Sequence, residues 1–310
     1  MNYAKQYIAV LAEKTKFNKD NLEKVLRLSE ILRFLNSDSN IRGKLALKGG
    51  TAINFTMVNL PRLSVDIDLD FTKNLSNDEI EDAKMKLSKN ITNYMWQKGY
   101  SLNVEQRRHY ALLSFSFNYI NNAGNNDHIK VEINFMDRCH IMPLEYKSVL
   151  SNGVFNSFQI LTLNVTELYA SKINALLSRA APRDLYDVYS MIKHDILKNK
   201  ILLKKCLIFY NMIGGEQDIN NISFENIEGI NFKKYKTQLK PVLAKSDSFN
   251  LDEAKTIVIN YLKTLLIIDE DEQRFIDEFR SKNFKPDLLF KDESIINNIK
   301  SHPMALWRCR

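Results

Sequence analysis

Short apolar runs and alternating apolar and polar positions fill the first half of the chain, and helical spacing fills the second. Between residues 41 and 163 the pattern is typical of strands mixed with helices, whereas from Val165 onward apolar residues recur every three or four positions. The apolar residues between Tyr7 and Leu35 also follow helical spacing. These patterns predict an α+β domain with N-terminal helices over residues 1–163, followed by a helical domain over residues 164–310.

Six strands are expected in the first domain, namely 44–48, 65–71, 102–107, 112–119, 129–136 and 159–163. One helix is expected between Ser76 and Lys98, where apolar residues trace a single helical face. The Asn-rich stretch 121–127 predicts a hairpin loop between two strands. The stretch 214–250 has little periodicity and is expected to be a long loop or insertion in the helical half.

Composition excludes several classes of protein. The 310 residues are 45% hydrophobic and 26% charged, which suits a folded chain of two domains rather than a disordered or fibrous one. There is no run of eighteen apolar residues for a membrane span, and the first residues lack the apolar run of a signal peptide. Three scattered cysteines, Cys139, Cys206 and Cys309, give neither a disulfide framework nor zinc-ligand spacing. We therefore expect a cytoplasmic protein.

An excess of basic residues favours a polyanionic partner. The chain has 44 Lys and Arg against 37 Asp and Glu, a formal charge of +7, and such a balance attracts nucleic acids over long range. The stretch from Lys233 to Lys245 is one basic cluster that would suit a nucleic-acid backbone. A solvated basic face is the alternative for this cluster.

A pair of glycines follows the expected strand 44–48 directly. The segment reads Lys48-Gly49-Gly50-Thr51 and precedes a helix-like run. Glycines at a strand-to-helix junction let backbone amides approach a ligand closely, and the N-terminus of a helix favours an anion such as phosphate. The alternative is an ordinary tight turn with Thr51 as a cap.

Three aspartates alternate with apolar residues in the next expected strand. Asp66, Asp68 and Asp70 share one face of the strand, and the intervening residues project into the core. Such a row of like charges is costly unless a cation neutralises it, and oxygen ligands suit a hard cation such as Mg²⁺. The alternative is a solvated edge strand.

The expected strand 129–136 carries one further carboxylate on its polar face. If it lies beside the aspartate strand with matching polarity, Glu132 reaches the metal site as a third ligand or activates an attacking hydroxyl. Exposure of that polar face to solvent explains the spacing equally well.

These motifs together resemble the polymerase-β-like nucleotidyltransferases, and specifically the AbiEii/AbiGii toxin branch. The resemblance extends to segments 167–176, 183–189, 286–290 and 302–308, so that it spans nearly the whole chain. It implies a nucleotidyltransferase domain with a mixed sheet, a helical C-terminal domain, and a substrate cleft between them. It also implies a toxin of a toxin–antitoxin or abortive phage infection system, with a regulator-like antitoxin partner.

The resemblance implies a reaction and roles for particular residues. A nucleoside monophosphate would be transferred from a nucleoside triphosphate (NTP) to an acceptor hydroxyl, with tRNA as the leading acceptor, and translation would be blocked. The catalytic residues implied are Asp66, Asp68, Lys172 and Asp184. Mg²⁺ or Mn²⁺ would be held by Asp66, Asp68 and Glu132. The nucleotide would be contacted by Lys48, Gly49, Gly50, Thr51, Ser64, Arg179 and Asp187.

The later motifs also have a physical interpretation of their own. Residues 164–167 predict a capping box at the start of a helix, on which Lys172 and Arg179 share one face and would hold a triphosphate. A solvated basic stripe is the alternative. Pro182 suits the first turn of a second helix, where Asp184 is stabilised by the helix dipole.

Two other functions stay open at this point. One is adenylylation of a small molecule or of a protein hydroxyl. The other is a catalytically inactive nucleotide-binding module that acts through partner proteins.

Overall fold

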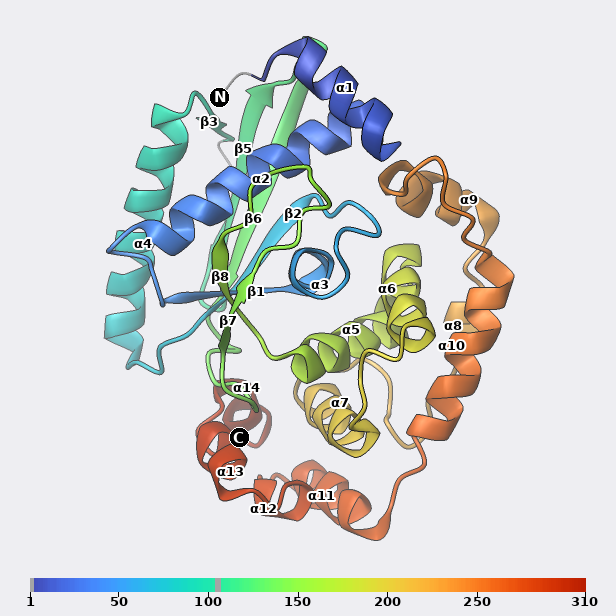
Figure 1. Cartoon of the computed structure of the whole chain (residues 1–310). Coiled ribbons are helices and arrows are strands. Elements are labelled where there is room, and N and C mark those ends of the chain that lie inside the picture. Colours follow the sequence, from blue (N-terminus) through green and yellow to red (C-terminus); the bar gives the residue numbers. More distant parts are fainter. Residues whose placement is uncertain (1–2, 104–106) are drawn as a thin grey trace. The chain divides into compact units, whose positions relative to one another are not determined.

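The computed structural model describes residues 3–103 and 107–310 and contains two compact units (Figure 1). The first, here called the sheet unit, comprises Met1–Arg138, Leu144–Thr162 and Val242–Asp247. The second, the helical unit, comprises Cys139–Pro143, Leu163–Pro241 and Ser248–Arg310. The domain division expected from the sequence stays a prediction, and the two units differ from it in the short segments 139–143 and 242–247.

A mixed sheet, as expected, forms the centre of the sheet unit and has eight strands in the part of the chain that the structure describes. Its strands are β1 (Leu45–Lys48), β2 (Asp66–Phe71), β3 (Ser101–Leu102), β4 (Arg107–His109), β5 (Leu112–Ile120), β6 (Asn126–Asn134), β7 (Glu145–Ser148) and β8 (Gln159–Thr162). Their order is β3-β5-β6-β2-β1-β8-β7, with β4 paired to β5. The β2–β6 and β1–β8 pairs are parallel and the other pairs are antiparallel.

The sequence located most of these strands. The hairpin expected around residues 121–127 is the β5–β6 pair, which is continuous from Leu112 to Ile120 on its first strand. Residues 104–106 of the expected strand 102–107 lie outside the described residues, and the flanking β3 and β4 both pair with β5. Strand β7 was missed because its four residues, Glu145–Ser148, carry no buried side chain.

Among its described residues, the sheet unit has four helices, namely α1 (Lys5–Thr15), α2 (Lys19–Ser37), α3 (Gly49–Thr56) and α4 (Asn77–Gln97). Figure 1 shows α2 crossing one face of the sheet. Helix α4 begins with a capping box between Ser76 and Glu79, and its apolar residues Ile80, Leu87 and Ile91 are buried. The helix expected between Ser76 and Lys98 is therefore confirmed.

The helical unit contains ten α-helices among the described residues, with a π-helix and the start of a 3₁₀ turn. These elements are α5 (Val165–Arg179), α6 (Pro182–Lys193), α7 (Lys200–Gly214), α8 (Glu225–Glu228), α9 (Phe232–Lys234), the π-helix η1 (Tyr235–Leu239), the 3₁₀ turn η2 (Lys240–Val242), α10 (Leu251–Leu265), α11 (Glu270–Arg280), α12 (Pro286–Leu289), α13 (Glu293–Ile299) and α14 (Pro303–Arg308). Of the two expectations for residues 214–250, the long loop was wrong, because α8, α9 and η1 lie within that stretch, and an insertion stays a prediction. Their four, three and five residues are too short to show a helical period.

One buried carboxylate corrects the prediction at the start of α5. Asn164 caps this helix by accepting a hydrogen bond from the Thr166 amide, but no capping box forms. The Glu167 carboxylate instead accepts hydrogen bonds from the amides of Ile141 and Met142 and from the Tyr210 hydroxyl. Glu167 therefore fastens the segment 139–143 to the helical unit.

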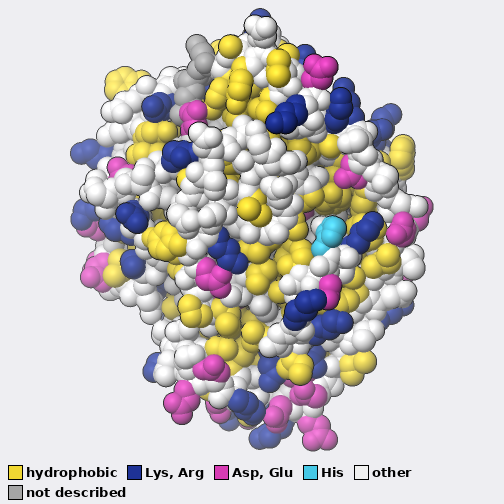
Figure 2. Space-filling view, in the orientation of Figure 1, with side chains coloured by type: hydrophobic (Ala, Val, Ile, Leu, Met, Phe, Trp, Pro, Cys, Tyr) yellow, Lys and Arg dark blue, Asp and Glu magenta, His cyan; other side chains and the backbone are white. Residues whose placement is uncertain are grey.

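Surface charge is spread over both units. Figure 2 shows Lys and Arg side chains interspersed with acidic and apolar side chains on the visible face of each. No helix in the described part of the chain combines the length and apolar character that a membrane span requires. The visible face therefore shows no single continuous basic surface.

Candidate functional site

The glycine pair lies where β1 ends and α3 begins. Gly49 has a φ of +69°, and a Cβ atom there would lie 2.7 Å from Oδ2 of Asp68. A Cβ atom on Gly50 would lie 2.8 Å from Nη2 of Arg62. Any side chain at either position would therefore collide with a charged group. The glycines bring the first turn of α3 against the aspartate strand, and the N-cap residue Lys48 makes no side-chain cap there.

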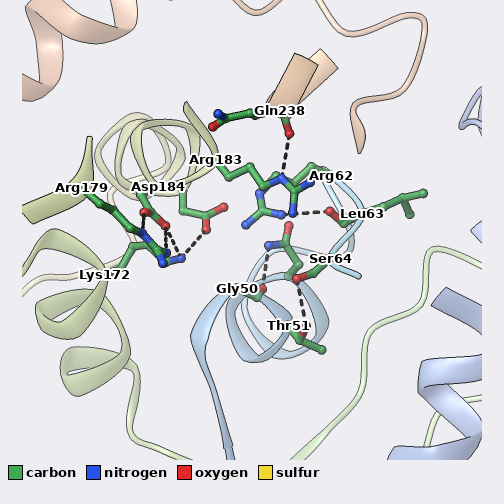
Figure 3. A network of polar contacts seen from close by, with 12 residues as sticks. Gly50, Thr51, Arg62, Leu63, Ser64, Lys172, Arg179, Arg183, Asp184 and Gln238 are labelled. Atoms are coloured by element: carbon green, nitrogen blue, oxygen red, sulfur yellow. Dashed lines mark hydrogen bonds and ion pairs between the residues drawn. The ribbon is translucent and has the colours of Figure 1, made fainter. Parts of the chain in front are cut away.

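The hydroxyl of Thr51 connects α3 to β2. It donates a hydrogen bond to the backbone carbonyl of Asp66 at 2.5 Å. It also lies 2.9 Å from the Ser64 hydroxyl oxygen (Figure 3). Thr51 is fully buried. Because the hydroxyl proton is already donated within the protein, a phosphate would be met here by backbone N–H groups, and the nucleotide contacts of Thr51 and Ser64 stay predictions.

The aspartate strand presents two of its three carboxylates. Asp66 and Asp68 are partly exposed, whereas the alternate residues Ile67 and Leu69 are buried, as expected. Strand β6 runs parallel to β2 and places Glu132 opposite Asp68. Strand β6 therefore lies beside the aspartate strand, which was the condition for Glu132 to reach the predicted metal site. Its carboxylate also forms an ion pair with Lys130 at 2.7 Å.

The third aspartate differs from the other two. Asp70 is buried, and its carboxylate lies 2.6 Å from the ammonium of Lys48. Lys48 also lies 3.4 Å from Asp137. Burial alone would lower the pKa of Lys48, but the charges of Asp70 and Asp137 outweigh burial and raise it, so Lys48 is protonated. Lys48 therefore neutralises Asp70, the buried member of the three aspartates. Contact of Lys48 with a nucleotide stays a prediction.

The remaining carboxylates fit a hard divalent cation. No group of three or more His, Cys, Asp or Glu side chains suited to a metal exists among the described residues. Two carboxylates suffice for Mg²⁺, because this ion usually keeps several waters and takes its other ligands from substrate phosphates. Asp66 and Asp68 supply such a pair on one face of β2, and Glu132 is the adjacent third carboxylate.

A buried arginine was missed as a site residue. Arg62 is 2% exposed, and its guanidinium donates to the carbonyl of Leu63 at 2.9 Å and packs against Gly50 (Figure 3). The guanidinium therefore lies directly against the glycine turn. An arginine two positions before Ser64 and four before Asp66 was visible in the sequence, but its burial was not.

The helical unit holds a second cluster of predicted residues. The ammonium of Lys172 lies 2.8 Å from Asp184 and 3.2 Å from Asp187. Arg179 donates to both oxygens of Asp184, through Nε at 2.7 Å and Nη2 at 3.1 Å (Figure 3). Asp184 lies in the first turn of α6, and Pro182 is at the start of that helix, as expected.

The charges in this cluster balance and fix the protonation of Asp184. Burial would raise the pKa of Asp184, but the charge of Lys172 and the hydrogen bonds from Arg179 lower it to about 2. A carboxylate that stays ionised is a poor general base at neutral pH. The contacts of Asp184 are instead with the cations of Lys172 and Arg179. The side chains of Lys172 and Asp184 are 7% and 1% exposed, whereas that of Arg179 is 64% exposed.

The structure thus assembles the predicted residues into two groups. The glycine turn, Asp66, Asp68 and Glu132 belong to the sheet unit, and Lys172, Arg179, Asp184 and Asp187 belong to the helical unit. The expected cleft that would contain both groups stays a prediction. The C-terminal motif has a packing role, because His302 is fully buried and its ring lies edge-on to Phe209.

Comparison with known proteins gives a family and a similar solved structure. Residues 31–287 match the family described as nucleotidyl transferase AbiEii toxin of type IV toxin–antitoxin systems. The fold is similar to that of MenT4, the nucleotidyltransferase toxin Rv2826c from Mycobacterium tuberculosis H37Rv, with a TM-score of 0.64 and 15% sequence identity. The similarity covers 98% of this chain and 99% of that one. No curated protein matches the chain.

Proposed function

The chain belongs to the AbiEii family of nucleotidyltransferase toxins of type IV toxin–antitoxin systems, and we propose that it transfers a nucleoside monophosphate from an NTP to the 3′ end of tRNA. Membership of this family implies an NTP substrate, a divalent metal and an antitoxin partner. The acceptor oxygen would form a bond to the α-phosphorus, the bond from that phosphorus to the β-phosphate oxygen would break, and pyrophosphate would leave. A tRNA with an added nucleotide is no longer a substrate for charging, so translation would stop.

The observation that carries this proposal is the position of Asp66 and Asp68 on one face of β2, with Gly49 packed against Asp68. These two carboxylates would hold the metal, which we propose is Mg²⁺ or Mn²⁺. When bound, such an ion offsets the charge that develops on the phosphates. Glu132 is the candidate third ligand or acceptor of the hydroxyl proton.

The cations of the protein have separate roles in this proposal. The amides at the start of α3 would bind the NTP phosphates, with the positive end of the helix and buried Arg62 behind them. Arg179 would neutralise a phosphate because its side chain is the most exposed in its cluster. Lys172 would contribute charge from a position fixed by Asp184 and Asp187.

A transfer assay tests the proposed acceptor. Purified protein is incubated with each α-³²P-labelled NTP, MgCl₂ and total tRNA, and the products are separated on a denaturing gel. We expect label on tRNA, and its loss when the 3′-terminal hydroxyl is first oxidised with periodate. Label on the protein or on a small molecule would overturn the RNA acceptor, and absence of any label would overturn the transfer reaction.

A further inference from the structure

A basic segment free of acidic residues lies on the helical unit. Between Gly229 and Ser246 the chain has five lysines and no Asp or Glu. Four of them, Lys233, Lys234, Lys236 and Lys240, are exposed. Within residues 3–103 and 107–310 none of these four ammonium groups has an ion-pair partner, although most other lysines of the helical unit lie beside a carboxylate or a carbonyl.

Aromatic rings accompany these lysines and are held in place. Phe232 is 64% exposed, and its ring lies 5.6 Å from that of Tyr235. Tyr235 stacks on Phe249 at 6.0 Å, and Phe249 packs against the buried Tyr186 and Tyr189 of α6. The exposed ring is therefore the outer end of a row of aromatic contacts that begins in the core. A ring fixed in this way loses little conformational entropy when it stacks on a ligand.

The segment that carries these residues is irregular. Lys233 and Lys234 end the short helix α9, and Tyr235 begins the π-helix η1. π-Helical turns are rare and occur frequently at functional sites. The phenylalanine, the tyrosine and the four lysines are called here the lysine–aromatic surface.

This surface adjoins the cluster around Asp184. The side chain of Arg183, the residue that precedes Asp184, donates through Nε to the backbone carbonyl of Gln238 in η1 at 2.7 Å (Figure 3). The rings of Tyr186 on α6 and Phe249, on which Tyr235 stacks, are 5.2 Å apart. A ligand on the lysine–aromatic surface would therefore lie close to the first turn of α6.

We infer that the lysine–aromatic surface binds the acceptor RNA, with its lysines on phosphates and Phe232 stacked on an unpaired base. The inference rests on the proposed function, because it names the part of the protein that holds the RNA acceptor. An unneutralised row of cations suits the regular charge of a nucleic-acid backbone. An exposed aromatic ring among cations is typical of surfaces that bind single-stranded nucleic acid, where any base can stack.

An acidic protein partner is the competing occupant. It would satisfy the four lysines, but it gives no reason for the aromatic ring or for the connection to Asp184. RNA accounts for all three features. Binding of the antitoxin at this surface is therefore one of the results that the test distinguishes.

The lysines are tested by the salt dependence of RNA binding. The full-length variant K233Q/K234Q/K236Q/K240Q is compared with K198Q/K263Q/K291Q/K300Q, which removes the same charge from exposed positions of the same unit. Binding of labelled total tRNA is measured by filter binding from 50 to 300 mM KCl. For the first variant, we expect the plot of the logarithm of the binding constant against the logarithm of salt concentration to become shallower, its negative slope decreasing in magnitude by about 3. We expect the control to keep the slope of the wild type.

The aromatic ring is tested separately. F232A should weaken tRNA binding by about 5- to 150-fold, the range for loss of one stacked base, and F232W should retain it. The circular dichroism and thermal midpoint of both variants should equal those of the wild type, because Phe232 is largely exposed. Equal loss in F232A and F232W would contradict stacking.

The outcomes separate this inference from the proposed function. If the wild type labels tRNA and the four-lysine variant binds tRNA with an unchanged slope, the surface is wrong and the proposed function stands. If the wild type binds no tRNA, both are overturned. If the four-lysine variant binds tRNA normally but loses a purified cognate antitoxin, the surface belongs to the protein partner and the inference is overturned.

Discussion

At the scale of single residues, Gly49 is the position where backbone geometry and site chemistry coincide. Its positive φ disfavours any L side chain, and its missing Cβ leaves room for the Asp68 carboxylate. A substitution would therefore act in two ways, through backbone strain and through displacement of Asp68. These two effects can be separated.

Gly49→Ala is expected to abolish transfer activity, while Gly124→Ala keeps it. Both glycines have positive φ, +69° and +86°, so each substitution should cost about 1 kcal/mol of stability from backbone strain. Only the Cβ at position 49 meets Asp68, and nothing lies within 4 Å of a Cβ at position 124. Denaturant unfolding and initial rates of transfer measure the two effects. Equal activity in both variants would show that Gly49 has no role beyond its turn.

Asp184→Asn is expected to change the pH dependence of stability. The folded pKa of about 2 lies below the ordinary value of 3.8, so Asp184 stabilises the folded protein fully above pH 4 and loses this contribution as the pH falls through 2. The contribution corresponds to about 2 kcal/mol. The free energy of unfolding should therefore fall less between pH 6 and pH 2.5 in the variant than in the wild type. Parallel curves for the two proteins would contradict the ion pairs.

At the scale of elements, the pairing of β1 with β2 explains why one aspartate differs from its neighbours. The antiparallel register sets Lys48 opposite Asp68, and its side chain reaches diagonally to Asp70. Sequence alternation puts all three aspartates on one face but does not show which strand lies beside them. Local spacing therefore predicted the face on which the carboxylates lie, and it could not show that a lysine neutralises the buried Asp70.

Lys48→Met is expected to destabilise the sheet unit by about 3 kcal/mol, because it leaves the buried Asp70 carboxylate without its ion pair. Lys48→Met combined with Asp70→Asn should recover most of the loss, since the second change removes the buried charge. Urea unfolding of both proteins measures the difference. If the double variant is no more stable than Lys48→Met, the Lys48–Asp70 pair does not control this region.

The features of the candidate site that depend on short sequence segments were predictable from the sequence. The glycine turn, the Asp66–Asp68 spacing and the helix starts near Asn164 and Pro182 follow from short segments. The place of Glu132 depended on which strands pair, which is a long-range property, so it could only be stated as a condition. The buried roles of Arg62, Thr51 and Glu167 depend on tertiary packing.

At the scale of the whole molecule, the proposed function assigns nucleotide contacts to residues of each unit. Arg179→Gln should raise the KM for NTP by about 10- to 100-fold with little change in kcat, as expected for loss of one hydrogen bond to a charged group. Arg274→Gln is the control, because Arg274 is similarly exposed, at 68% against 64%, and lies in the same unit. An unchanged KM in Arg179→Gln would indicate that the helical unit does not contact the nucleotide.

In the proposed function, Asp66 and Asp68 hold a divalent ion together with the nucleotide. Mn²⁺ binding in the presence of a non-hydrolysable NTP analogue, followed by electron paramagnetic resonance, measures this directly. We expect tight binding by the wild type and by the control Asp78→Asn, whose side chain is exposed, and a loss of at least about 100-fold in Asp66→Asn/Asp68→Asn. Mn²⁺ affinity that is unchanged in the double variant would contradict the claim.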